Sequence, residues 1–284
     1  MDTAIRAQVP RTARPIRTHL SVDAVRSAIG IAVFVAIWEL GAHSAQIFGA
    51  PFPWIGRLPA PEAVLATWAD LVVHKAYWID LYLSFLRVAS GFLVAVVIGV
   101  PFGLLLALNR WAYQIIFPTF EVIRPIPPIA WVPASILFWP TQDLSIGFVI
   151  FLGAIFTIML NVIGGARSID IRFFQAARSM GSSNWDIFRR IILPGVLPSI
   201  IVGCEVGIGI TWNVVVAAEM ISGGGGAIQS SAGGGLGFFI WSSYIGGSYP
   251  QIVVGMISIG IAGYISSAII RRVGLLVTPW MRAR

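Results

Sequence analysis

Charged side chains gather in one stretch of this chain, residues 175–194, which reads QAARSMGSSNWDIFRRIILP. The ionisable residues within it or at its edge are Asp170, Arg172, Arg178, Asp186, Arg189 and Arg190. The runs before and after it carry almost no charge. A charge at the centre of a bilayer costs about 2.5–3.5 kcal/mol on insertion scales. This charged segment must therefore lie in water, tied to the membrane at both ends, where it can form ion pairs and hydrogen bonds with another protein.

Motifs for catalysis or nucleotide binding are missing from the sequence. No GxxxxGK[ST] occurs, and the single lysine, Lys75, lies outside any glycine-rich context. The glycine runs at 223–226 and 233–235 have no basic residue nearby and predict a flexible extracytoplasmic loop. The three histidines lack the spacing of metal ligands, and neither GxSxG nor HExxH is present. We therefore expect no catalytic residue, no metal site and no cofactor bound by this chain itself.

The composition is that of an integral membrane protein. Hydrophobic residues make up 57% and charged residues 11% of the 284 residues, and the mean hydropathy is +0.85. Soluble domains are about 45–50% apolar and about 25% charged. The formal charge of +7 comes from arginines dispersed among apolar runs, which argues against nucleic-acid binding. Since a helix needs about 20 apolar residues to cross a bilayer, roughly five to seven helices fit this length.

Six apolar runs predict an all-α fold with six transmembrane helices, at about 27–48, 84–108, 113–139, 144–163, 196–221 and 252–270. The third run contains PIPP at 125–128, and we expect a broken helix there because each interior proline removes a backbone hydrogen bond. Broken backbone at membrane depth is tolerated where it is buried in protein or lines a wet cavity. Residues 1–26 are basic and predict a disordered cytoplasmic tail, and residues 27–284 predict one transmembrane domain.

The distribution of basic residues predicts the orientation of the chain. With six spans, fifteen arginines fall on the side of both termini and of the charged segment, against three basic residues on the other side. Short cytoplasmic loops carry the excess of Lys and Arg in membrane proteins. We therefore expect both termini and the charged segment to be cytoplasmic.

The charged segment itself predicts a helix, a turn at Gly181, and a second short helix over 184–192 that stops at Leu193-Pro194. Trp185, Phe188 and Ile192 recur at helical spacing and would form an apolar stripe. Two interpretations remain open on this pattern. The second helix either packs on the protein's own spans or docks into a groove of another protein.

The spacing of the charged segment resembles a known motif. Q-A-A is followed after three residues by Gly181, after nine more by Ile191, and after one more by Leu193-Pro194. This is similar to the EAA loop of permease subunits of bacterial ATP-binding-cassette (ABC) importers. Further stretches resemble the branch that carries nitrate, bicarbonate, cyanate, sulfonate or taurine, namely RPIPPIAWVP at 124–133, Asn161 to Gly165, WNVVVAAEM at 212–220 and LGFFIWSSY at 236–244. The resemblance covers about residues 60–275.

The resemblance implies a type I importer permease fold with a cytoplasmic coupling helix, in a coupling loop at about 170–194. The residues that would couple to the ATPase are Gln175, Ala176, Ala177, Gly181, Trp185, Asp186, Phe188, Arg189, Leu193 and Pro194. Gln175 stands where the family usually has Glu, so the contact at that point would be a neutral hydrogen bond.

The implied activity is ATP-driven import of a small anion by alternating access, in the inner membrane of a bacterium. ATP and Mg²⁺ would bind partner ATPase subunits, an extracytoplasmic binding protein would deliver and select the substrate, and a second copy of the chain would complete a homodimer. The alternative is an ATP-independent secondary transporter or channel for small anions, which would transport without an ATPase.

Five polar residues within the apolar runs are candidates for the translocation path: Glu121, Arg124, Asn161, Asn213 and Glu219. Glu121 and Arg124 are three residues apart and could instead neutralise each other on one helix face. Glu219 would act either as a gate or as a contact with the binding protein. For Glu205 we expect a snorkelling or arginine-paired side chain.

Overall fold

The computed structural model describes residues 17–49, 58–223 and 233–280, and in these ranges it is all-helical. Five helices are long and apolar enough to cross a membrane: Ala24–Ala42, Lys75–Leu108, Gln142–Arg167, Asn184–Ser222 and Tyr249–Val277. A sixth candidate is the pair Arg110–Ile123 and Pro128–Phe138, which is bent by 87°. Five or six candidate spans agree with the prediction of six, and the predicted break at PIPP is confirmed.

The chain divides into two compact units, Met1–Val64 and Leu65–Arg284. The first unit contains α1 (Arg17–Ala42) and α2 (Ser44–Phe48). In this unit, the Trp38 indole donates to the Pro59 carbonyl at 3.1 Å, and His43 lies 3.1 Å from the Glu39 carboxylate. Residues 17–26, which the sequence assigned to a disordered tail, are helical, and residues 1–16 lie outside the described ranges.

Helix α3 (Pro61–Val73) leads into α4 (Lys75–Leu108). The helix α4 begins nine residues before the predicted start of the second span at residue 84, and Arg87 is buried in its interior. The start of this helix was predicted too late because the buried face of its first turns carries polar side chains. Tyr77, Asp80, Ser84 and Arg87 are all buried on it, and this mixture hides the apolar periodicity.

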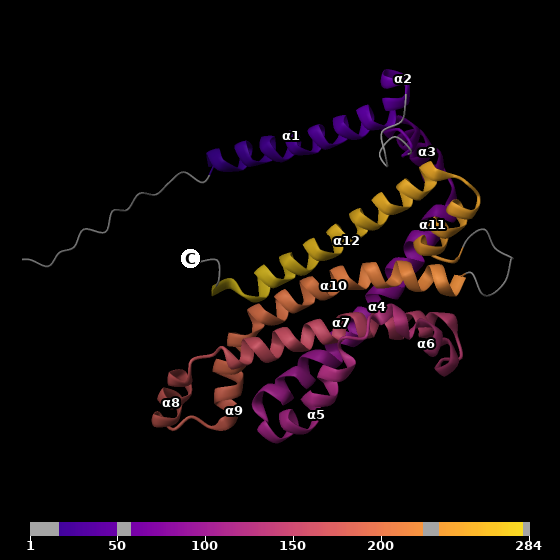
Figure 1. Ribbon diagram of the computed structural model, residues 1–284. Helices are drawn as coiled ribbons and strands as arrows, with labels where there is room; N and C mark the ends of the chain where they lie inside the picture. The colour runs from indigo at the N-terminus through magenta and orange to yellow at the C-terminus, as the bar shows by residue number, and fades with distance from the viewer. Residues whose placement is uncertain (1–16, 50–57, 224–232, 281–284) are drawn as a thin grey trace, which may run out of the picture. The chain divides into compact units, whose positions relative to one another are not determined.

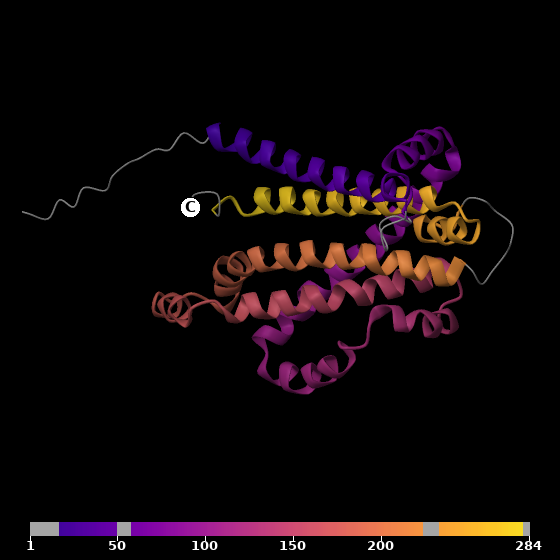
Figure 2. The same ribbon diagram turned by 45° about the horizontal axis from the view of Figure 1, so that its top comes forward.

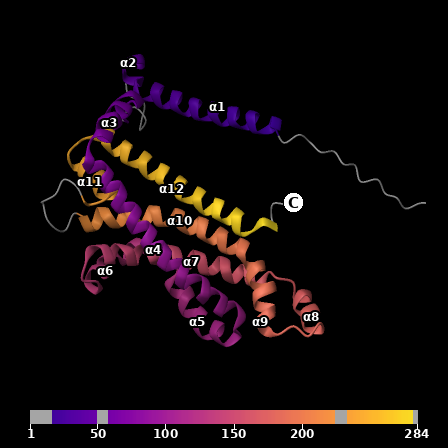
Figure 3. The ribbon, with the colours of Figure 1, turned by 180° about the vertical axis from the view of Figure 1, so that it is seen from behind.

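The remaining elements of the second unit follow in order. They are α5 (Arg110–Ile123), the 3₁₀ turn Pro128–Trp131, α6 (Val132–Phe138), α7 (Gln142–Arg167), α8 (Ile171–Ser179), α9 (Asn184–Ile187), the π-helical turn Phe188–Ile192, α10 (Leu193–Gly223), α11 (Leu236–Ile245) and α12 (Tyr249–Val277). The helix α10 runs between α7 and α12 (Figures 1 and 2). The helices α8 and α9 lie at one end of α7 and α10, whereas α6 and α11 lie at the other end (Figures 1 and 3).

Glycines allow α4, α7 and α10 to pack closely around a core in which Ile150, Ile158 and Val162 of α7 are fully buried. A Cβ on Gly91 of α4 would lie 2.9 Å from the Gly147 carbonyl oxygen, and one on Gly165 of α7 would lie 2.4 Å from Ser199 of α10. Small residues at such positions are the usual means of close helix packing in lipid. The helix α7 is therefore the centre of this unit.

The neighbouring glycines Gly164 and Gly165 provide a test of this packing. We expect Gly165→Leu to lower the free energy of unfolding by about 1–3 kcal/mol, because overpacking forces helices apart. The matched control is Gly164→Leu, because a Cβ on Gly164 meets nothing within 4 Å. Thermal unfolding of the purified variants in detergent measures both effects, and equal Tm values for the two variants would contradict the packing described.

Candidate functional site

The charged segment is shaped by a glycine turn at the end of α8. Gly181 has φ of 77°, its N–H donates to the Arg178 carbonyl at 3.0 Å, and the Ser182 N–H donates to the Ala177 carbonyl at 3.0 Å. These two bonds form a Schellman motif, which needs a left-handed residue after the helix and therefore favours glycine. The predicted turn at Gly181 is confirmed.

A side-chain cap then starts α9. The Ser183 hydroxyl accepts the Asp186 N–H at 3.1 Å and donates to the Asp186 carboxylate at 2.5 Å. This reciprocal contact satisfies an orphan donor of the first helical turn. Asp186 is thus used at least in part to begin the helix.

The short helix does not stop at Leu193-Pro194 as predicted. The backbone remains helical from Asn184 through the π-helical turn Phe188–Ile192 into α10. In a regular α-helix, the Pro194 ring would clash with the carbonyl four residues earlier. That carbonyl belongs to Arg190, which lies in the wider π turn Phe188–Ile192, so the π turn can relieve the clash.

Side chains of the charged segment divide between the protein core and its surface. Ala177, Ile187 and Ile192 are buried, and Phe188 packs against the core. Trp185 is 67% exposed and stacks on Phe188 with ring centroids 5.6 Å apart, and Met180 is 78% exposed. The predicted stripe of Trp185, Phe188 and Ile192 is therefore not a single face.

The exposed apolar side chains Met180 and Trp185 lie in the same segment as the exposed residues Gln175, Ala176 and Arg189. Together they form a surface suited to contact with another protein.

The path candidates Glu121 and Arg124 are both exposed, at the bend between α5 and the 3₁₀ turn. Within the described ranges, no ion pair joins them, so the suggested mutual neutralisation is not seen. Asn161 lines a depression of about 360 Å³ together with Gly164, Ser168 and Ser199. Its side-chain amide donates to the Thr157 carbonyl at 2.9 Å.

Asn213 is exposed near the middle of α10, and no hydrogen bond of its side chain is found among the described residues. Val202 and Val206 are also exposed, and a Cβ on Gly209 would meet nothing within 4 Å. These four positions recur at helical spacing along one face of α10. The face is uncovered in the single chain and carries a polar group at membrane depth.

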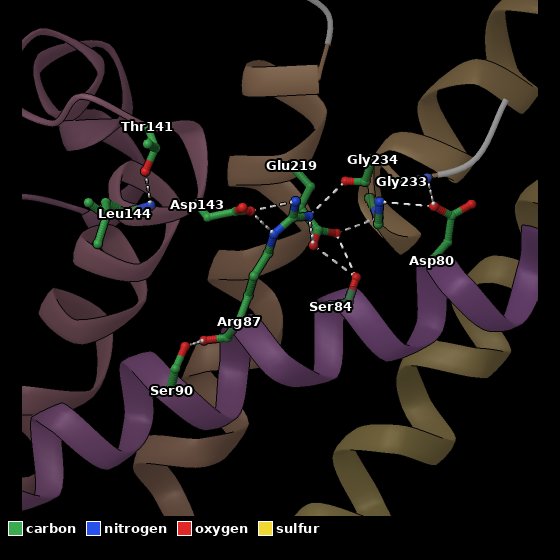
Figure 4. A network of polar contacts seen from close by, with 12 residues as sticks. Asp80, Ser84, Arg87, Ser90, Thr141, Asp143, Leu144, Glu219, Gly233 and Gly234 are labelled. Carbon is green, nitrogen blue, oxygen red and sulfur yellow. Dashed lines mark hydrogen bonds and ion pairs between the residues drawn. The ribbon is translucent and has the colours of Figure 1, made fainter. Parts of the chain in front are cut away.

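Glu219 occupies a different environment, in a buried network that sequence reasoning missed (Figure 4). Its carboxylate is fully buried and accepts from Arg87 Nη1 at 2.8 Å, from the Ser84 hydroxyl at 2.8 Å and from the Gly237 N–H at 2.9 Å. Arg87 also reaches Asp143 of α7, with its Nη2 2.8 Å from Oδ1. A buried arginine and carboxylate stabilise each other only when both are paired in this way.

The same network holds the first turn of α11. Asp80 accepts the N–H groups of Gly233 and Gly235 at 2.9 and 3.1 Å, and the Ser84 hydroxyl accepts the Leu236 N–H at 2.8 Å. The N–H groups at the start of a helix lack intrahelical acceptors. Here side chains of α4 and α10 act as the acceptors. The spacing of Asp80, Ser84 and Arg87, four and three residues apart, is the sequence signal of this shared face.

A second ion pair joins α10 to α12. Glu205 of α10 accepts from Arg271 Nη1 of α12, which confirms the expected arginine partner. Among the described residues, no group of three His, Cys, Asp or Glu side chains is arranged to hold a metal ion.

The fold is that of a multi-span membrane protein, with an exposed charged segment at one end and a buried charge network at the other. The family described as "Binding-protein-dependent transport system inner membrane component" matches residues 99–283, and the chain belongs to this family. It is 31% identical over 278 residues to the nitrate import permease protein NrtB of Synechocystis sp., covering 95% of this chain and 94% of that protein. It is also 31% identical over 236 residues to the bicarbonate transport system permease protein CmpB of Synechococcus elongatus, covering 82% of each.

Among solved structures, a chain of the MetNI methionine ABC transporter in an inward-facing conformation resembles the fold. The TM-score is 0.55 at 23% sequence identity, over 72% of this chain and 95% of that one. The chain is thus an all-helical ABC permease with the type I importer fold, as predicted.

The buried network predicts unequal effects for Arg87 and for its exposed partner Asp143. We expect Arg87→Met to lower the free energy of unfolding by about 3–5 kcal/mol, because it leaves Glu219 buried without a counter-charge. Asp143 is 73% exposed, so Asp143→Asn should cost only about 0–1 kcal/mol. Thermal unfolding of both variants checks this, and Glu219→Gln added to Arg87→Met should restore part of the loss. Equal destabilisation by the two single variants would show that burial does not govern the network.

Proposed function

We propose that this chain is the transmembrane subunit of an ATP-driven importer for a small anion of the nitrate, bicarbonate, cyanate, sulfonate or taurine type. The observation that carries the proposal is the similarity to nitrate and bicarbonate import permeases, which reaches 95% of the chain. ATP and Mg²⁺ bind separate ATPase subunits. A binding protein delivers the anion on the extracytoplasmic side.

The charged segment is the contact with the ATPase in this proposal. Trp185 and Met180 are large, apolar and exposed, and they lie on a segment too rich in charge for the membrane interior. The Ser183 cap, bonded to Asp186, begins the helix that carries Trp185, and the turn at Gly181 precedes this cap. The residues proposed to take part are Gln175, Ala176, Ala177, Gly181, Trp185, Asp186, Phe188, Arg189, Leu193 and Pro194. At Gln175, which is exposed, the contact is a neutral hydrogen bond.

The translocation path in this proposal runs between two copies of the chain. A polar side chain left unpaired in hydrocarbon is costly, so the face of α10 with Asn213 must meet a wet cavity or protein. An isologous dimer places the same face of each copy opposite its mate. Asn161, at the depression with Ser168 and Ser199, and Arg124, beside the bend, add donors for an anion. Glu121 is exposed beside Arg124, whereas the buried Glu219 acts within the wall of the path.

The orientation follows from the positive-inside rule. Both termini and the charged segment face the cytoplasm, where ATP is available. The opposite end, with α6 and α11, faces the binding protein. Closure of the ATPase subunits on ATP moves the two charged segments, and α10 transmits this movement to the path.

Trp185→Ala tests the proposed coupling. We expect the variant to assemble in the membrane but to lose about tenfold or more of binding-protein-stimulated ATPase activity and uptake, because an aromatic anchor at an interface centre contributes 2 kcal/mol or more. The control is Trp78→Ala, since Trp78 is also exposed, at 50%, but lies in the first turn of α4. Both activities are measured in proteoliposomes that contain the complete assembly. Unchanged coupling in Trp185→Ala would show that the charged segment does not contact the ATPase there.

A further inference from the structure

A groove of about 490 Å³ lies between α4 and α7, close to the buried network but outside the proposed translocation path. Its walls are apolar, formed by Val94 and Ile98 of α4, by Leu144, Phe148 and Phe151 of α7, and by Trp139. Gly147 forms part of its floor, and a Cβ on Gly147 would meet nothing within 4 Å. The absence of a side chain at this position leaves the groove open.

The groove belongs to two spans that lie in hydrocarbon. Val94, Ile98 and Leu144 are 47%, 46% and 49% exposed, so its rim faces outward. Water would find polar partners only at the end with Asp143 and Ser90. From Asp143 to Phe151 the groove follows α7 for about 12 Å, at 1.5 Å per residue. A groove of this length with apolar walls suits part of an acyl chain.

The mouth of the groove carries an available negative charge. Asp143 is 73% exposed, and its Oδ1 accepts both Nε and Nη2 of Arg87, at 2.9 and 2.8 Å. Its other oxygen, Oδ2, has no partner among the described residues. The network at this end contains three carboxylates, of Asp80, Asp143 and Glu219, and a single guanidinium, of Arg87 (Figure 4). A cation is therefore favoured beside Asp143.

We propose that this groove is a binding site for a phospholipid with a primary-amine head group, of the phosphatidylethanolamine type. One acyl chain fills the space between Val94, Ile98, Gly147 and Phe148. The ammonium group donates to Asp143 Oδ2 at the mouth. The lipid would bind where α4 and α7 meet beside Asp143. Its binding would not depend on which anion is carried.

A photoactivatable phosphatidylethanolamine with a diazirine in its acyl chain tests the site. The full chain, assembled with its ATPase subunits in nanodiscs, is irradiated, and the labelled peptides are mapped by mass spectrometry. We expect labelling at Leu144 and Phe148 that falls about tenfold in Gly147→Phe, because the new ring fills the groove. The control is Val97→Phe, since Val97 is 63% exposed on α4 but does not line the groove.

The head group is tested separately, because Asp143→Asn changes no volume. We expect the wild type to prefer phosphatidylethanolamine over phosphatidylcholine, and Asp143→Asn to reduce this preference about three- to fivefold. Equal labelling by both lipids in the wild type would overturn the head-group assignment. Labelling of Val97 as strong as that of Leu144 would indicate ordinary surrounding lipid. Cross-links from the groove to a second copy would show that protein, and not lipid, covers the groove. Either result would overturn the proposed site.

Discussion

The cost of a polar group in hydrocarbon is the constraint on which this structure depends. It divides the polar residues of the spans into two classes. Glu219 with Arg87 and Glu205 with Arg271 are satisfied inside the chain, and each pair joins two helices. Asn213 and Arg124 are exposed without such a partner among the described residues. The ion pairs of the first class hold neighbouring helices together. The exposed residues of the second class mark the surface that water, substrate or a second copy must cover.

Continuity between the charged segment and α10 gives the proposed coupling a mechanical basis. The helical backbone runs from Asn184 to Ser222, so Trp185 on the surface and Asn213 in the span belong to one element. The Schellman turn at Gly181 and the Ser183 cap determine where this element begins. At its far end, Glu219 ties it to α4 and to the start of α11. A displacement of the charged segment would therefore reach both the proposed path at Asn213 and the end of α10 at Glu219.

Local chemistry in the sequence was enough to predict much of this molecule. PIPP predicted the broken third span, the glycine after QAARSM predicted the turn, and hydropathy predicted the spans. Interactions between distant residues were not predictable in the same way. Arg87 and Glu219 are 132 residues apart, and nothing local shows that they meet. The continuation of the helix through Pro194 was also missed, because a π turn is a backbone adjustment without a clear sequence pattern. The roles of the coupling and path residues remain predictions.

Uptake into proteoliposomes tests most directly whether transport depends on ATP. Two preparations are compared, this chain alone and this chain with its ATPase subunits and binding protein, each supplied with isotopically labelled nitrate or bicarbonate. ATP-coupled import predicts accumulation only in the complete assembly, only with ATP, and no accumulation with a non-hydrolysable analogue. Accumulation by the chain alone, driven by an ion gradient without ATP, would contradict it and would favour a secondary transporter or channel.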